Sequence, residues 1–283
     1  PAAVPSLCGP SPARWASPRQ GGSRVGGVIG AVRGIADGQV VSGITCDTDP
    51  SLMAMVSSGQ LVWTSAVARY SDASGTSWTS TGTLSAAIDA VSSGGFVELL
   101  QDVTLTEGLT VSDKSFTLRS NSDGEVVYTI ERGGDYTGSL LTVSGTGNVT
   151  LANITLDGGA EWGGTNDGTL AAAPQTTAGR EQPLISVGNS SSLTLDSGAV
   201  LRNNDSSRGD GGVSVSGATF NMTGGSITGN TARADDGGGG VYVGRNATFN
   251  MSDGSITGNN ATATATTSGG VLVMNGGTFN MTG

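Results

Sequence analysis

Residues that could bind a ligand gather in four polar, glycine-rich segments, at 157–183, 202–210, 231–238 and 260–268. The candidates are one aromatic residue, one glycine and six charged residues: Trp162, Asp167, Arg208, Gly209, Asp210, Arg233, Asp235 and Asp236. Loops that emerge on one face of a repetitive fold commonly carry its binding function. We therefore predict one binding face formed by these segments, and we assign no residue to catalysis.

Arg208, Gly209 and Asp210 form an RGD tripeptide, which resembles the integrin-binding motif. Short motifs of this kind also arise by chance, especially in a chain with 48 glycines. A polar turn without a binding role is the structural alternative.

Three carboxylates, those of Asp210, Asp235 and Asp236, could stack across neighbouring segments into one cluster. Clustered carboxylates bind Ca²⁺, and Ca²⁺ is the only cofactor that the sequence suggests. The alternative is that the three side chains are solvated loop charges, so no metal ligand is assigned.

Composition narrows the classes of function further. The chain has no histidine, so the commonest general base and metal ligand is missing. It has 13 basic and 23 acidic residues, and Lys114 is its only lysine, so we expect no nucleic-acid partner. Cys8 and Cys46 could form one disulfide. No apolar run is long enough to span a membrane, and we expect a fragment that lacks its export signal and its C-terminal anchor.

A repeat of about 29 residues must position the four segments. Phe220, Phe249 and Phe279 recur after 29 and 30 residues, which is typical of a solenoid. Within a repeat the apolar residues alternate with polar ones, which predicts short strands with one face inward. The sequence therefore predicts an all-β fold: a right-handed parallel β-helix with three short strands per turn and about seven or eight turns.

Equivalent residues of successive turns should form ladders along the solenoid. The two predicted core ladders are Leu193, Phe220, Phe249 and Phe279, and Leu195, Met222, Met251 and Met281. Asn203, Asn230 and Asn259 each lie three residues after the last apolar residue of a predicted strand, which is Val200, Ile227 or Ile256. We interpret these asparagines as structural, because Asn suits left-handed corners and stacked amides can bond one another.

The domain organisation follows from where the repeat begins. Residues 1–66 do not share it and are partly linker, with possible strands at 25–32, 39–46 and 60–67. Residues 67–283 form the predicted β-helix domain, truncated at the C-terminus. Thr83 can cap a helix at about 83–92, which would cover the apolar end of the solenoid.

The sequence resembles a known group of proteins in two places. The LSAAIDAV segment, the double glycine and the FVELLQDVTL strands, at 84–105, resemble the start of bacterial right-handed β-helix surface proteins of the pectin-lyase-like superfamily. The ITGNTA and ITGNNA units, followed by GGVY and GGVL, are similar to the FxxN and GGxI repeats of polymorphic outer-membrane proteins and adhesins. Here Ile stands in place of the Phe of FxxN, and Val stands in place of the Ile of GGxI.

This resemblance implies two functions of different classes. The first is a non-catalytic, adhesin-like β-helix that is secreted or on the cell surface and displays its loops to a host surface protein, a matrix ligand or a glycan. The alternative is a polysaccharide lyase or glycoside hydrolase of the pectin-lyase-like fold, since this fold carries both kinds of protein. The oligomeric state is left open.

Overall fold

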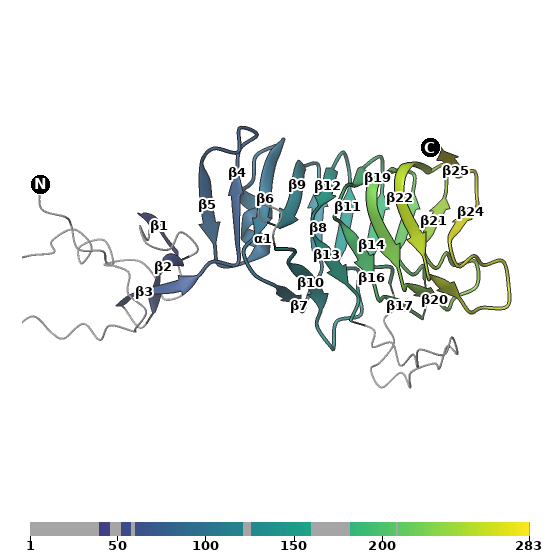
Figure 1. Ribbon diagram of the computed structural model, residues 1–283, viewed down its shortest axis with the longest axis horizontal. Coiled ribbons are helices and arrows are strands. Elements are labelled where there is room, and N and C mark those ends of the chain that lie inside the picture. The colour runs from purple at the N-terminus through teal and green to yellow at the C-terminus, as the bar shows by residue number, and fades with distance from the viewer. Residues whose placement is uncertain are drawn as a thin grey trace, which may run out of the picture.

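The computed structural model describes residues 40–45, 52–57, 60–120, 126–159, 182–207 and 209–282. Most of these residues form a stack of parallel strands that winds into an elongated solenoid (Figure 1). This confirms the predicted all-β parallel β-helix. The solenoid has about five turns, fewer than the seven or eight predicted. The early turns are longer than the repeat: Leu141 pairs with Ile185, 44 residues further along the chain.

One side of the solenoid is a six-stranded parallel sheet in which each strand pairs with its equivalent in the next turn. Its strands are β8 (Leu109–Ser112), β11 (Leu141–Ser144), β14 (Ile185–Gly188), β18 (Val213–Ser216), β21 (Val241–Gly244) and β24 (Val271–Val273).

A thirteen-stranded sheet forms the other sides in two rows of strands. The first row is β6 (Gly95–Leu99), β9 (Ser115–Ser120), β12 (Asn148–Ala152), β15 (Ser192–Leu195), β19 (Thr219–Thr228), β22 (Thr248–Thr257) and β25 (Thr278–Met281). The second row is β7 (Val103–Leu105), β10 (Thr129–Arg132), β13 (Thr155–Asp157) and β16 (Val200–Arg202). In the later turns the two rows merge, because β19 and β22 each run through both.

Two short sheets complete the described structure. The strands β17 (Asp205–Ser206), β20 (Thr231–Ala232) and β23 (Asn260–Ala261) form a small parallel sheet that the sequence did not predict. The strands β1 (Val40–Thr45), β2 (Leu52–Ser57) and β3 (Gln60–Ser65) form an antiparallel sheet before the solenoid. The predicted strands at 39–46 and 60–67 match β1 and β3, whereas β2 was not predicted, and the strand at 25–32 lies outside the described residues.

The core consists of the predicted ladders. Phe220, Phe249 and Phe279 pair in register, and their rings stack at centroid distances of 4.7 and 4.8 Å. These distances match the spacing of neighbouring strands, about 4.8 Å. Met222, Met251 and Met281 pair in register as the second ladder, which is buried at Met222 and open to solvent at Met281, where the residue is 70% exposed. Because strand side chains alternate, the residues between these positions point outward.

The N-terminal end of the solenoid is capped, as predicted, by a helix. Helix α1 (Leu84–Ala90) begins after Thr83, whose side chain accepts a hydrogen bond from the Ala86 amide. The Lys114 ammonium donates to the Ile88 and Asp89 carbonyl oxygens near its C-terminus. The strands β4 (Ala68–Ser71) and β5 (Trp78–Thr81), which were not predicted, extend the sheet antiparallel beyond β6.

Candidate functional site

Loops of successive turns leave the solenoid at one corner, and we call this region the loop corner. Its base is the sheet β17–β20–β23, and its loops are the segments 202–210, 231–238 and 260–268. A parallel bridge between Gly238 and Ser268 joins two of the loops at their C-terminal ends. The structure thus confirms that these three segments share a side. The fourth segment, 157–183, is described only at its two ends.

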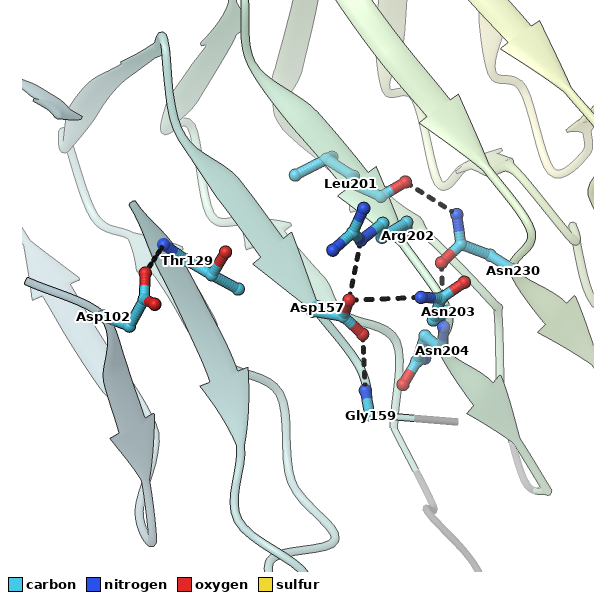
Figure 2. A network of polar contacts seen from close by, with 9 residues as sticks. All are labelled: Asp102, Thr129, Asp157, Gly159, Leu201, Arg202, Asn203, Asn204 and Asn230. Carbon is cyan, nitrogen blue, oxygen red and sulfur yellow. Dashed lines mark hydrogen bonds and ion pairs between the residues drawn. The ribbon is translucent and has the colours of Figure 1, made fainter. Parts of the chain in front are cut away.

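A ladder of buried asparagine side chains supports the loop corner from below (Figure 2). The Asn230 side chain accepts from the Asn204 amide at 3.1 Å and donates to the Leu201 carbonyl oxygen at 3.1 Å. It also donates to the Asn259 side-chain oxygen at 3.0 Å. The Asn204 and Asn230 residues are fully buried. These contacts agree with the structural interpretation of the repeated asparagines.

The predicted register of this ladder was wrong by one residue. Leu201, and not Val200, pairs with Ile227, so the ladder member is Asn204 instead of Asn203. Val200 and Leu201 are both apolar, and the repeat alone does not reveal which of the two side chains faces inward. Asn203 instead occupies the preceding corner position, where its φ is 56° and the equivalent residue in the next turn is a glycine. The left-handed corner at Asn203 and the ladder position at Asn204 are therefore adjacent in sequence but distinct.

An ion pair between turns fixes the start of the loop corner (Figure 2). The Arg202 Nε atom lies 2.7 Å from Oδ2 of Asp157. The side-chain Nδ2 of Asn203 donates to the same oxygen at 3.1 Å. The other Asp157 oxygen accepts from the Gly159 amide at 2.8 Å. Asp157 is almost completely buried while Arg202 is exposed. The Asp157 carboxylate is thus occupied by structural contacts.

A second ion pair joins the next two turns. Arg233, a predicted site residue, donates from Nε and Nη2 to the two carboxylate oxygens of Asp205 at 2.6 and 2.7 Å. The hydrogen bond to Asp205 raises the pKa of the Arg233 guanidinium, which is charged in any case. This fork geometry is directional and strong. Arg233 therefore holds β17 and β20 together at the base of the loops instead of pointing from their tips.

Asp210 occupies an unusual position for a carboxylate. Its Oδ1 atom accepts from the Gly238 amide at 3.1 Å, and its carboxylate also accepts from the Ser214 hydroxyl. Burial raises the pKa of Asp210 to about 6 from an ordinary value of 3.8. Within the RGD tripeptide this carboxylate is engaged internally, so binding an external partner would require it to leave Gly238.

The three carboxylates proposed for Ca²⁺ do not converge. Asp210 lies against Gly238, whereas Asp235 and Asp236 are exposed further out in their loop. Asp235 instead accepts from the Ala265 amide of the next turn at 3.4 Å. Among the described residues, no three Asp, Glu, Cys or His side chains come close enough to hold a metal ion. The possible cluster does not form among these residues, because stacking places Asp210 against a residue 28 positions later, Gly238.

Three predicted site residues, Trp162, Asp167 and Arg208, lie outside the described residues, as do Cys8 and Cys46. Gly209 is described and is partly exposed. The structure therefore brings together Gly209, Asp210 and Arg233 at the loop corner, with Asp235 and Asp236 at an exposed tip.

Sequence reasoning missed the partners that hold this corner, Asp157, Arg202 and Asp205. A signal was present, because opposite charges recur close to one repeat apart: Arg233 lies two residues after Thr231, the residue of the next turn that pairs with Asp205. A second missed network lies on the outer face near the cap. There the buried Glu98 carboxylate pairs with Arg69 at 2.6 Å and with Arg119 at 2.8 Å.

Comparisons of the chain with protein-family models, with curated proteins and with solved structures find no match. None of the helical segments in the described ranges is long and apolar enough to cross a lipid bilayer. The chemistry of the site must therefore be argued from its own residues. They form a rigid, internally bonded base from which exposed loop tips project.

Proposed function

We propose that this chain is a non-catalytic, adhesin-like β-helix that is secreted or on the cell surface and binds a host protein, a matrix ligand or a glycan through its loop corner. The pectin-lyase-like, bacterial β-helix surface proteins that the sequence resembles are the group to which we would assign it. The observation that carries the proposal is the shared exit of loops from successive turns, above a base that turn-to-turn contacts hold in place.

Those contacts suit a binding platform better than an acid–base site. Asp157 and Asp205 are each paired with an arginine of the next turn. These carboxylate oxygens are occupied by the guanidinium groups and are therefore not free to contact a substrate. Exposed loop residues on a rigid scaffold are free to contact a partner at little ordering cost.

One observation favours an enzymatic alternative, a polysaccharide lyase or glycoside hydrolase. The raised pKa of Asp210, about 6, is the kind of perturbation that marks general acids. A glycoside hydrolase, however, needs two carboxyl groups placed across the bond that it cleaves. Asp210 faces a backbone amide and a hydroxyl, which is the arrangement of a structural carboxylate.

A binding screen with the full chain tests the proposal. The chain would be passed over immobilised matrix proteins and a panel of glycans, together with a double variant, Asp235→Asn with Asp236→Asn, that removes the exposed tip charges. The control variant is Asn250→Ala, on the outer face of β22 away from the loop corner. We expect a ligand whose binding falls in the double variant and is unchanged in the control.

Other results would contradict the proposed binding function. If no ligand binds, or if the double variant and the control behave alike with every ligand, the loop corner is not the binding face. Release of reducing or unsaturated sugar from a polysaccharide, abolished by Asp210→Asn, would establish the enzymatic alternative instead.

A further inference from the structure

The six-stranded sheet carries a second candidate surface, separate from the loop tips. None of its strands, β8, β11, β14, β18, β21 and β24, contains Asp, Glu, Lys or Arg. Its outward positions are instead mostly hydroxyl-bearing: Thr110, Ser112, Thr142, Ser144, Ser186, Ser214 and Ser216. In a chain of net charge −10 these strands carry no charge of their own, so a charged ligand would find no ion-pair partner on them.

One aromatic residue, Tyr242 of β21, interrupts the hydroxyl columns. It pairs with Ser214 of the preceding turn and with Leu272 of the next, and it is partly exposed. Because Val241 and Val243 face the core, Tyr242 points outward. An outward tyrosine on a neutral face is the single large contact surface of this sheet.

The tyrosine ring lies along its own strand over Gly244. A Cβ atom built on Gly244 would be 2.5 Å from the ring carbon Cε1 and 2.7 Å from Cζ. A side chain at 244 would therefore occupy the space of the ring. Serine fills the equivalent position of the preceding turn, Ser216, so the sheet itself does not require glycine there. The glycine thus lets the ring rest against the backbone while Tyr242 stays partly exposed.

A second contact fixes the ring at its far end. The side-chain amide of Asn275 donates to the Tyr242 hydroxyl oxygen at 3.1 Å. Asn275 is exposed in the turn after β24 and has a φ of 53°, a conformation that asparagine tolerates. The ring is held from below and at its tip before any ligand arrives, which lowers the entropy cost of binding.

We propose that Tyr242 is a stacking platform for a neutral glycan that lies across the six-stranded sheet. The negative face of the ring attracts the polarised C–H groups of a sugar ring. Hydroxyl side chains of the preceding strands, spaced by about 4.8 Å, would bond the sugar hydroxyls on that side of the ring. The proposal rests on the proposed function and names its ligand class, and it places the sugar beside the loop corner, since Ser214 also contacts Asp210.

Glycine substitutions give a matched pair of variants for the test. Gly244→Ala would push the ring off the sheet, while Gly188→Ala adds the same methyl group in the same column two turns earlier. At Gly188 the nearest atom to the added Cβ is a backbone oxygen at 3.7 Å, which is ordinary contact. Tyr242→Ala removes the ring, and Tyr242→Phe keeps it without the hydroxyl.

The experiment is an NMR titration of the full chain with cellohexaose, with mannohexaose and with an oligogalacturonate as the anionic comparison. We expect a neutral hexasaccharide to shift the Tyr242 ring resonances, and Tyr242→Ala and Gly244→Ala each to weaken its affinity at least tenfold. Gly188→Ala should change the affinity less than twofold, and Tyr242→Phe should retain most of it. The titration of the unsubstituted chain locates the site even if a variant fails to fold.

Three results would overturn the proposal. They are the absence of any neutral-sugar binding at millimolar concentration, binding that Tyr242→Ala leaves intact, and binding of the anionic oligosaccharide alone. If a ligand from the screen still depends on Asp235 and Asp236 in such a case, the loop-corner function stands and only the glycan platform fails.

Discussion

Asn230 offers a sharp test of the buried amide ladder through the substitution Asn230→Asp. The two side chains have nearly the same shape, so the change removes hydrogen-bond donors without opening a cavity. The retained oxygen can still accept from the Asn204 amide. The other oxygen would face two acceptors, the Leu201 carbonyl oxygen and the Asn259 side-chain oxygen, to which the asparagine donates at 3.1 and 3.0 Å.

The expected loss of stability at pH 7 follows from these contacts. Leaving a buried acceptor without its donor costs about 1 to 3 kcal/mol, and Asn230→Asp does this at the Leu201 carbonyl oxygen, whereas the Asn259 side-chain oxygen keeps the Asn230 backbone amide as a donor. Burial of the new charge adds to this cost, so we expect the free energy of unfolding to fall by about 3 to 5 kcal/mol. The control is Asn250→Asp, because Asn250 belongs to an outward amide ladder, donates to Asn221 at 3.0 Å and is partly exposed. That change should cost under about 1 kcal/mol.

The pH dependence of the loss provides a second, independent check. Burial without a positive partner raises the pKa of the new carboxyl in the folded state above its value of about 3.9 in the unfolded chain. The folded state therefore takes up a proton first as the pH falls, and the loss relative to the unsubstituted chain shrinks toward pH 4. The protonated carboxyl can also donate one of the two missing bonds.

Urea unfolding followed by circular dichroism, at pH 7 and at pH 4.5, measures both effects. Because solenoids can unfold from one end, hydrogen exchange at β16 and β19 should be read alongside. Equal losses for Asn230→Asp and Asn250→Asp at pH 7, or a loss that grows as the pH falls, would refute the reasoning about the ladder.

Three further predictions concern the core, a buried carboxylate and the cap. Phe249→Ala should lower the free energy of unfolding by about 3 to 5 kcal/mol, and Asn250→Ala by under about 1 kcal/mol; equal losses in urea would mean that the strand register is wrong by one. Asp210 has a pKa raised to about 6, so its ionisation opposes folding, and the free energy of unfolding should rise by about 1.3 kcal/mol as the pH falls from 7 to 5. Asp210→Asn should remove that rise, whereas an unchanged pH profile would place the titration elsewhere. Glu98→Gln should cost about 3 kcal/mol, because it leaves two arginines beside a neutral group, with faster hydrogen exchange in β4 and β6; unchanged protection there would show that the ion pairs are dispensable.

The repeat in the sequence was enough to predict the fold and the core, because strand geometry has a fixed period of two. Once Phe249 and Met251 are assigned to one face, every neighbouring residue follows, and the rings of Phe220 and Phe249 must stack at the strand spacing. The capping helix was also predictable, because Thr83 supplies a local hydrogen bond to its own helix.

The loop corner was predictable in its location and not in its contacts. Each loop follows the same strand of its turn, so the three described segments, 202–210, 231–238 and 260–268, had to leave the solenoid on one side. Which side chains meet there depends on the stacking offset, and Asp210 reaches Gly238 of the next turn instead of Asp235. Because Gly238 lies only three residues after Asp235, the spacing of the sequence alone could not show that Asp210 meets a backbone amide and not a second carboxylate.

The sequence by itself therefore determined the architecture, the inward and outward faces, and the corner that displays the loops, since these depend on local periodicity. Only the tertiary structure decided the partners: Arg202 for Asp157, Asn204 instead of Asn203 in the amide ladder, and Gly244 beneath the ring of Tyr242. Such contacts join residues of different turns or depend on how a side chain leans on its strand. They are set by the lengths of the intervening loops and by packing, and neither is visible in the spacing of apolar residues.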